Sequence, residues 1–553
     1  MTQEISALQK ARAAYRPKMP AALREGFAKL AVKKGAPTTA AGDAGKIAKI
    51  FPNLYGQPAV SFVKGKGTPK TAAVNVGVVL SGGQAPGGHN VIAGLFDALK
   101  SLNPASKLLG YLGGPQGLID DKFIDLTGEI IGQYRNTGGF DIIGSGRTKL
   151  ETEKQFAQTQ QTAKRSNLSA IVIIGGDDSN TNACTLAEWF AAKGEKIQVI
   201  GVPKTIDGDL RNQQIEMCFG FDTAVKLYSE LIGNVCRDAN SARKYYHFIK
   251  LMGRSASHIT LEAALQTQPN VAIISEEVAE KKLTLKQIVE QIAEVVVARA
   301  KKGKDFGIVL VPEGLVEFVP EINALIGELN DILGSHEEQF KSLRRREERV
   351  EFLNRNLTKD SAVCYNSLPA DIQEQLTRER DTHGNVYVSG IQTEALLAKM
   401  VEAELKELKA AGAYKGKFSA QTHFFGYEGR CAPPSNFDAD YSYSLGYVAA
   451  GLIANGLTGY MSCVCNLTKP ADQWSPCGVP LASMMCVERR KGKDRPVIRK
   501  ALTDLNAKPF KTFAAKRAEW GIEEKYLYPG PIQYFGPSEV CDAPTKTLVL
   551  ERS

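Results

Sequence analysis

Long apolar runs, paired metal-binding cysteines and a secretory leader are all missing from this sequence of 553 residues. No segment approaches the roughly 18 consecutive uncharged apolar residues that a membrane-spanning helix needs, so we expect no membrane segment and no membrane partner. The N-terminal residues have no apolar core and no cleavage-like end, so a reducing, cytoplasmic setting is expected. The 10 cysteines are scattered without a Cys-x-x-Cys pair, which gives no support for a zinc site.

A strong charge of one sign is also missing, because the formal net charge is only +9. Apolar residues make up 43% and charged residues 23%, which excludes a disordered chain, a collagen and a small disulfide scaffold. The densest basic run, Arg344–Arg346, is followed by Glu347 and Glu348, a mixture typical of a solvated helix face. We therefore expect no nucleic-acid partner, whereas a phosphorylated small molecule fits the mild positive charge.

Three familiar nucleotide-binding patterns fail on inspection. The Walker pattern needs Gly-Lys-Ser/Thr, but Gly45-Lys46 is followed by isoleucine. The dinucleotide fingerprint fails because Lys149 stands where its third glycine belongs. The triplet at 305–307 spells Asp-Phe-Gly, but no His-Arg-Asp catalytic loop precedes it. These absences exclude the P-loop, dinucleotide-binding and protein-kinase classes.

What is present, from Val74 onward, is an alternation of short apolar runs with amphipathic stretches, typical of an α/β chain with buried parallel strands. We expect strands at 74–80, 170–174, 197–202, 245–252, 270–275 and 307–312. We expect helices at 183–193, 221–239, 284–301 and 391–410. Between Leu315 and Ser389 the strand signal disappears, which predicts a largely helical insertion at 316–389.

Two glycine-rich loops follow the first two strands, and ligands of α/β sheets bind at the carboxyl ends of strands. The first, SGGQAPGGHN (81–90), leads into a helix whose N-terminus and backbone amides suit a phosphate. The second is GGDDSNTNA (175–183). Its paired carboxylates Asp177 and Asp178 suit Mg²⁺, which commonly bridges carboxylates and substrate phosphates. The alternative is that Asp178 or Ser179 caps the next helix, and both can hold.

The third loop, PKTIDGDL (203–210), places Lys204 beside Asp207 and Asp209. A carboxylate there can take the proton of a substrate hydroxyl, and a lysine can neutralise a transferring phosphoryl group. The alternative is a polar turn with a surface ion pair. Three loops of this kind on successive strands favour phosphoryl transfer.

The ordered motifs SGGQAPGGHN, GGDDS, PKTIDGD, MGR (252–254), PEG (312–314) and GYEGR (426–430) resemble the phosphofructokinase family. Within it they resemble the long, pyrophosphate-dependent fructose-6-phosphate 1-phosphotransferases, over about 74–490. The implied fold class is α/β, with two Rossmann-like parallel-sheet domains. The implied parts are an N-terminal arm at 1–73, a domain binding pyrophosphate and Mg²⁺ at 74–240 completed by 440–490, a sugar-phosphate domain at 241–440, and a C-terminal extension at 491–553.

The resemblance implies a role for each candidate residue on the donor side. Asp207 would be the general base for the sugar's 1-hydroxyl, and Asp177, with Asp209 nearby, would engage Mg²⁺. The remaining candidates are Gly82, through its backbone amide, and Arg147, which would both approach the donor phosphates.

On the sugar side, the resemblance implies a set of substrate-binding residues. Tyr427 and Arg430 would hold the distal phosphate, while Lys244 and Tyr245 would reach across to a neighbouring subunit, implying a homo-oligomer with shared active sites. The segments expected to line the substrate are Thr205, Ile206, Met252, Gly253, Arg254 and Glu313.

Donor choice rests on Asp178 and Lys204, where relatives that use ATP typically have glycine. A carboxylate at 178 would lie where the α-phosphate of ATP belongs and reject it, whereas Lys204 would stabilise pyrophosphate transfer. We therefore expect Mg²⁺-dependent, reversible transfer from pyrophosphate to fructose 6-phosphate. Two alternatives stay open: an ATP-dependent phosphofructokinase, and a non-catalytic regulatory subunit of a mixed oligomer.

Overall fold

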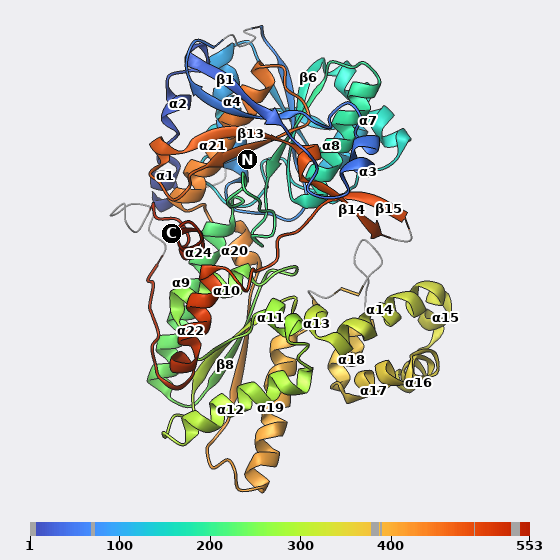
Figure 1. The fold of residues 1–553 in the computed structure, drawn as a ribbon, viewed down its shortest axis with the longest axis vertical. Helices are drawn as coiled ribbons and strands as arrows, with labels where there is room; N and C mark the ends of the chain where they lie inside the picture. Colours follow the sequence, from blue (N-terminus) through green and yellow to red (C-terminus); the bar gives the residue numbers. More distant parts are fainter. Residues whose placement is uncertain (1–6, 68–71, 378–385, 388–389, 491–492, 532–541) are drawn as a thin grey trace. The chain divides into compact units, whose positions relative to one another are not determined.

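The computed structural model describes residues 7–67, 72–377, 386–387, 390–490, 493–531 and 542–553. Parts of the predicted arm, insertion and extension lie outside these residues, namely 1–6, 68–71, 378–385, 388–389, 491–492 and 532–541. Internal contacts divide the chain into two compact units (Figure 1). Unit 1 comprises Met1–Leu227, Tyr427–Ala501 and Ile532–Ser553, and unit 2 comprises Tyr228–Gly426 and Leu502–Pro531.

Unit 1 is built on a nine-stranded sheet in the order β1-β2-β13-β12-β7-β6-β3-β4-β5. Its central strands, from β12 to β4 in this order, are parallel, whereas β5 at one edge and β13, β2 and β1 at the other are antiparallel. The strands are β1 (Leu30–Pro37), β2 (Pro58–Lys64), β3 (Asn75–Leu80), β4 (Lys107–Tyr111), β5 (Phe123–Asp125), β6 (Leu168–Gly175), β7 (Gln198–Pro203), β12 (Tyr460–Cys465) and β13 (Ser475–Pro480).

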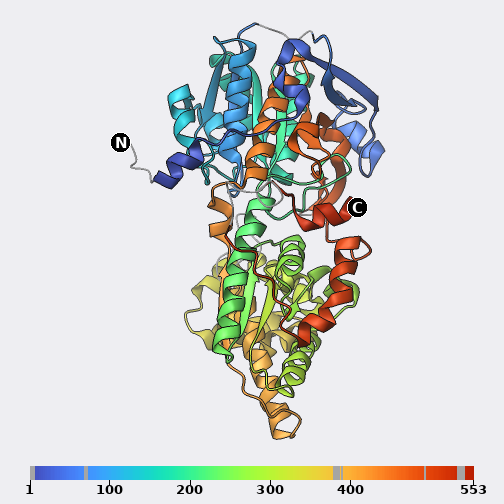
Figure 2. The same ribbon diagram turned by 90° about the vertical axis from the view of Figure 1, so that its left-hand side faces the viewer.

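The N-terminal segment, expected as an arm outside the core, contributes to this sheet instead. Strand β2 pairs with β13, and the antiparallel pair of β1 and β2 forms the edge (Figures 1 and 2). Ile47 and Phe51 from the same segment are fully buried. This strand pair could not be predicted from the sequence, because β1 is exposed over most of its length and carries lysines, as edge strands commonly do.

Helices cover the sheet of unit 1, and α4 packs closely against α21. Helix α8 begins at Asp177, earlier than the predicted start at 183, so the two adjacent aspartates lie in its first turn. The helices are α1 (Ala7–Ala13), α2 (Ala21–Arg24), α3 (Ala44–Ile50), α4 (Gly88–Leu102), α5 (Pro115–Asp120), α6 (Gly128–Tyr134), α7 (Glu153–Arg165), α8 (Asp177–Ala192), α20 (Tyr427–Cys431), α21 (Asn436–Ala454) and α24 (Lys546–Glu551), with the short 3-10 helices η1 (Phe27–Lys29), η3 (Ala471–Gln473) and η4 (Leu481–Met484).

Unit 2 contains a four-stranded, fully parallel sheet in the order β11-β8-β10-β9. The predicted strands at 245–252 and 307–312 are confirmed. Of the predicted strand at 270–275 only Val271–Ala272 is a strand, and a helix already begins at Ser275. Strand β11 was missed because it is a polar, half-exposed edge strand. The strands are β8 (Tyr246–Leu251), β9 (Val271–Ala272), β10 (Gly307–Pro312) and β11 (Ala420–Phe425).

Helix α9 (Phe221–Ala242) contains the boundary between the units, after Leu227, whereas the sequence placed a domain boundary at its end. In unit 2, α10 packs against β10, and α19 packs against α12 and against β8 and β11 (Figure 1). The helices outside the insertion are α10 (His258–Thr267), α11 (Ser275–Glu280), α12 (Leu285–Ala300), α19 (Thr393–Ala410) and α22 (Lys508–Ile522). No helix in the described part of the chain is long and apolar enough to cross a membrane.

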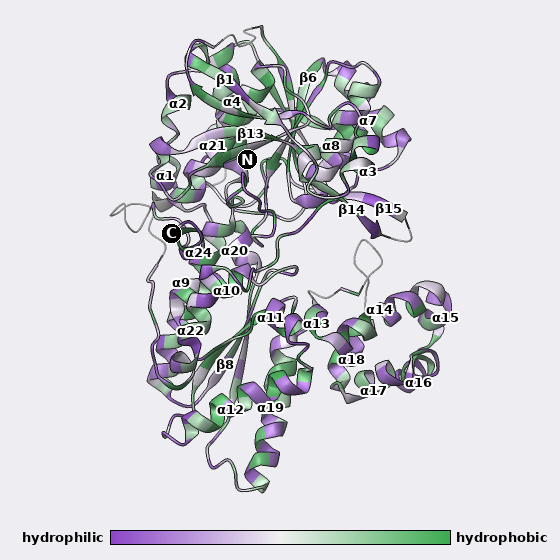
Figure 3. Ribbon diagram, viewed as in Figure 1, coloured by the Kyte–Doolittle hydropathy of each residue, from purple (hydrophilic) through white to green (hydrophobic). Residues whose placement is uncertain are grey.

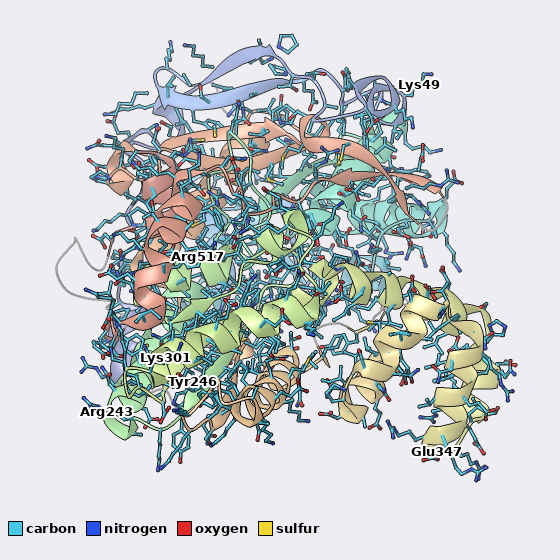
Figure 4. The ribbon with its side chains drawn as sticks, turned by 60° about the horizontal axis from the view of Figure 1, so that its bottom comes forward. Lys49, Arg243, Tyr246, Lys301, Glu347 and Arg517 are labelled. Atoms are coloured by element: carbon cyan, nitrogen blue, oxygen red, sulfur yellow. The ribbon has the colours of Figure 1, made fainter. Side chains whose placement is uncertain are left out.

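A run of helices follows β10, in the segment predicted as a helical insertion. Leu325, Leu329 and Leu353 bury themselves in the apolar core of unit 2, while α16 is largely hydrophilic (Figure 3). Glu347 projects from α16 (Figure 4), and Arg345 pairs with Glu348 at 2.6 Å, so acidic neighbours offset the basic run. The helices are α13 (Leu315–Phe318), α14 (Pro320–Ser335), α15 (Glu337–Ser342), α16 (Arg346–Asn356), α17 (Lys359–Ser367) and α18 (Ala370–Thr377).

Candidate active site

The loop after β3 approaches a second glycine loop of unit 1 very closely. Gly82 has φ +85°, a conformation that favours glycine. Its N–H donates to the carbonyl oxygen of Gly146 at 2.9 Å. The amide thus has a backbone partner in this structure, and its contact with the donor phosphate stays a prediction. The hydroxyl of Ser81 accepts a hydrogen bond from Ser179 at 2.8 Å, which ties this loop to α8.

Three cationic side chains surround the backbone of Gly82 and Gly83. A Cβ atom added to Gly82 would lie 3.2 Å from Nζ of Lys204. One added to Gly83 would lie 2.9 Å from Nη1 of Arg430 and 3.6 Å from Nη2 of Arg147. The glycine pair thus leaves room for a group of positive charges, which we call the cation cluster: Lys204, Arg147 and Arg430. Such a cluster suits a polyanion with several oxygens.

Lys204 lies almost completely buried at the end of β7, with its backbone N–H donating to Gly175 at 3.0 Å. Burial, together with the charges of Arg430 and Arg147, lowers the pKa of Lys204 to about 8. The carboxylate of Asp207 acts in the opposite direction. The ammonium group is therefore still mostly protonated at neutral pH, but it is held without the water shell that would weaken its interaction with an anion.

Asp207 places a carboxylate oxygen directly beside the cation cluster. Nη2 of Arg430 lies 3.9 Å from its Oδ1. That oxygen is buried and has no hydrogen-bond partner among the described residues. The backbone N–H of Asp207 donates to the hydroxyl of Thr205 at 3.0 Å, which fixes the turn. A desolvated carboxylate oxygen without a donor is available to accept a proton from a substrate hydroxyl.

Asp209 is held from two sides. Its Oδ1 accepts a hydrogen bond from the hydroxyl of Thr205 at 3.3 Å, and its Oδ2 lies 3.4 Å from Nζ of Lys500. Burial, and then the charge of Asp207, raises the pKa of Asp209 to about 6. Both carboxylate oxygens are thus engaged within the protein, and the role of Asp209 as a metal ligand stays a prediction.

The two adjacent aspartates occupy the first turn of α8, where the helix dipole favours negative charge. The helix is capped by Gly176 without a side-chain hydrogen bond, so the alternative that Asp178 or Ser179 serves as the cap is wrong. Asp177 is half-buried. Oδ2 of Asp178 lies 3.5 Å from Nζ of Lys149, a residue that sequence reasoning considered only as a break in a glycine pattern.

In unit 2, the strands β8, β10 and β11 end level with one another, because Leu251 is in register with both Pro312 and Phe425. The segment Met252–Arg254 follows β8, and Glu313 follows β10. The buried carboxylate of Glu313 accepts the N–H of Gly253 at 2.8 Å. The predicted MGR and PEG motifs thus come together at one edge of this sheet.

Glycine at 314 is required by close packing in the same place. A Cβ atom there would lie 1.9 Å from the carbonyl oxygen of Arg254. The PEG motif therefore positions the backbone of the MGR motif.

Elsewhere in unit 2, Lys244 is exposed and its Nζ lies 4.9 Å from the ring centre of Tyr245.

The structure also places three further candidate residues, Ile206, Tyr427 and Arg430. The side chain of Ile206 is fully buried, so only its backbone could line the substrate as part of the predicted segment. Tyr427 is 60% exposed. Arg430, predicted to hold the distal phosphate, donates to the carbonyl oxygen of Gln84 at 3.1 Å and lies beside Asp207. The distal role stays a prediction, whereas the geometry places Arg430 in the cation cluster of unit 1.

Comparisons with known proteins agree with the motifs. The family model for Phosphofructokinase matches residues 75–453. A pyrophosphate–fructose 6-phosphate 1-phosphotransferase of Porphyromonas gingivalis is 56% identical, over 99% of each chain. The protein of the same name from Treponema pallidum (strain Nichols) is 52% identical, over 99% of this chain and 97% of its own.

A solved structure shares the fold. The crystal structure of a pyrophosphate-dependent phosphofructokinase from Nitrosospira multiformis superposes with a TM-score of 0.54 at 17% identity, covering 84% of this chain and 95% of that one. At this identity the likeness concerns the fold alone, whereas the family match and the relatives extend along the sequence itself. This chain belongs to the phosphofructokinase family.

Proposed function

We propose that this chain is an enzyme that transfers a phosphoryl group from pyrophosphate to the 1-hydroxyl of fructose 6-phosphate, giving fructose 1,6-bisphosphate and phosphate. The names of relatives that match almost the whole chain support this assignment. The observation that carries it is the cation cluster around Gly82 and Gly83, with the free carboxylate oxygen of Asp207 beside it. This reaction belongs to glycolysis and gluconeogenesis, and a cytoplasmic location remains a prediction.

The proposed chemistry needs little covalent participation by the protein, because phosphoryl transfer depends mainly on positioning and charge stabilisation. Asp207 accepts the proton of the 1-hydroxyl as that oxygen attacks the donor phosphorus and the bond to the leaving phosphate breaks. In the reverse direction the same carboxyl group returns the proton. Lys204, Arg147 and Arg430 hold the donor oxygens and offset the charge that develops on them.

The carboxylate oxygens of unit 1 suit a Mg²⁺ ion that binds together with pyrophosphate. The described residues contain no group of three or more His, Cys, Asp or Glu side chains that could hold a metal alone. Mg²⁺ commonly needs only one or two carboxylates, with substrate phosphates and water completing its shell. Asp177, half-buried in the first turn of α8, would supply such a carboxylate, which leaves the unbonded oxygen of Asp207 to act as the base. When bound, Mg²⁺ would neutralise phosphate charge on the donor.

The sugar phosphate is assigned to a different set of residues. Met252, Gly253 and Arg254, braced by Glu313, would bind it in unit 2, and the hydrogen bond from Gly253 to Glu313 supports this grouping. We also propose a homo-oligomer of two or more copies. In it, Lys244 and Tyr245 serve the sugar-phosphate site of a neighbouring copy.

Pyrophosphate is favoured over ATP by the charges at the start of α8. Asp178 would oppose the α-phosphate of ATP, and its 3.5 Å pairing with Lys149 keeps the carboxylate directed towards the loop that carries Arg147. Lys204 supplies a buried positive charge for the shorter donor. A non-catalytic regulatory subunit would be expected to lack the base or the phosphate-binding side chains, but all of these residues are present here.

The proposal can be tested in the reverse direction with the purified chain alone. Incubation with fructose 1,6-bisphosphate, Mg²⁺ and radiolabelled phosphate should yield labelled pyrophosphate and fructose 6-phosphate in equal amounts. Fructose 6-phosphate formed only when ADP is supplied would indicate an ATP-dependent enzyme. No product under either condition would favour the regulatory subunit.

A further inference from the structure

The end of strand β15 reaches the candidate catalytic loop, a contact that no motif suggested. Strands β14 (Met485–Arg490) and β15 (Lys493–Ile498) form an antiparallel hairpin next to α8, and the hairpin is predominantly hydrophilic (Figures 1 and 3). At its base, the N–H of Ile498 donates to the hydroxyl of Thr181 on α8 at 3.3 Å. Three residues further on, the N–H of Ala501 donates to the carbonyl oxygen of Asp209 at 2.7 Å. The segment after β15 is therefore fastened to both sides of the donor site.

Lys500 lies within this segment and directs its ammonium group at the same aspartate. Its Nζ is 3.4 Å from Oδ2 of Asp209, and the side chains are 31% and 8% exposed. The other oxygen of Asp209 accepts from the hydroxyl of Thr205 at 3.3 Å. That hydroxyl in turn accepts the backbone N–H of Asp207 at 3.0 Å. A continuous set of contacts thus leads from Lys500 to the backbone of the candidate base.

We propose that Lys500 is a positioning residue that holds the Asp209 carboxylate in place and, through Thr205, fixes the backbone of Asp207. The inference rests on the proposed function for its effect on rate, but not for its effect on structure. Asp209 is buried close to two other carboxylates, Asp177 and Asp207, whose charges repel it. A buried carboxylate without a counter-ion is costly, so loss of the ammonium group would displace the Asp209 side chain and release Thr205.

Lys500→Met tests this idea, because methionine keeps the apolar stem and removes the charge. We expect kcat with pyrophosphate to fall by roughly 10- to 100-fold, the scale of a small misplacement of a catalytic group. The KM values for pyrophosphate and fructose 6-phosphate should change by less than about threefold, because Lys500 touches neither substrate in this account. Lys500→Arg should restore most of the rate. Arg499→Met removes the same charge from an exposed neighbour and should behave as the wild type.

A second measurement does not depend on activity. Hydrogen exchange of the 203–210 loop should show lost protection at the Asp207 amide in Lys500→Met, but not in Arg499→Met. Unchanged kcat with unchanged exchange would overturn the inference. So would a raised KM at normal kcat, or equal losses in the two methionine variants. A wild-type chain without activity would contradict the proposed function, while the exchange result would still decide the role of Lys500.

Discussion

Replacing the candidate base is the sharpest single perturbation, and Asp207→Asn makes it with almost no change of shape. The backbone N–H that donates to Thr205 at 3.0 Å is retained, so the turn should stay intact. What is lost is the proton-accepting oxygen, which is buried beside Arg430 and has no hydrogen-bond partner among the described residues. General base catalysis contributes roughly 10²–10⁴ in rate, which corresponds to about 2.7–5.4 kcal/mol in the barrier.

The assay is the initial rate in both directions, because one carboxyl group takes the proton in the forward reaction and returns it in the reverse. We expect both kcat values to fall by the same factor within that range, with the melting temperature little changed. Asp125→Asn is the control, since this aspartate is 52% exposed and pairs only at the surface with Lys107. A loss below tenfold, or a loss in one direction only, would refute the assignment of Asp207 as the base.

Three further predictions concern donor choice, the cation cluster and stability. Asp178→Gly should make ATP bind measurably tighter in competition with pyrophosphate, because the opposing carboxylate is gone; unchanged ATP binding contradicts this. Gly83→Ala should lower pyrophosphate turnover by roughly 10- to 100-fold, because its Cβ would lie 2.9 Å from Arg430, whereas Gly132→Ala, with nothing within 4 Å, should not. Burial lowers the pKa of His89 from 6.5 to about 4, so the unfolded chain takes up the proton first as the pH falls. His89 should therefore contribute a loss of about 3 kcal/mol of stability between about pH 6.5 and 4, and urea unfolding of His89→Gln should show a loss that is smaller by about this amount.

The strands that carry the site could be predicted because each is a short, continuously apolar run followed by glycine or charge. The predicted strand at 170–174 corresponds to β6, and the predicted strand at 197–202 corresponds to β7. The two loops that follow these strands could therefore be located from the sequence. The edge strands could not be found in this way. β1 is exposed over most of its length and β11 is half-exposed, so neither is a continuously apolar run.

The same limit applies to the site. Residue types and motif order singled out Asp207, Asp177 and Lys204 as candidates, but could not predict the contacts between them. The neighbouring residues in the sequence do not mark Lys149 or Lys500 as part of the site. Each lysine belongs to it only because folding brings it close to an aspartate. The partner of the Gly82 amide could not be predicted either, because a backbone hydrogen bond between two loops does not depend on residue type.

The central claim, that pyrophosphate is the phosphoryl donor, is tested most directly by initial rates of the purified chain with fructose 6-phosphate and Mg²⁺. Pyrophosphate and ATP are compared as donors at equal concentration in the same preparation. The account predicts rapid formation of fructose 1,6-bisphosphate with pyrophosphate and little or none with ATP. A preference for ATP would contradict the roles given to Asp178 and Lys204, even though the fold and the family would stand.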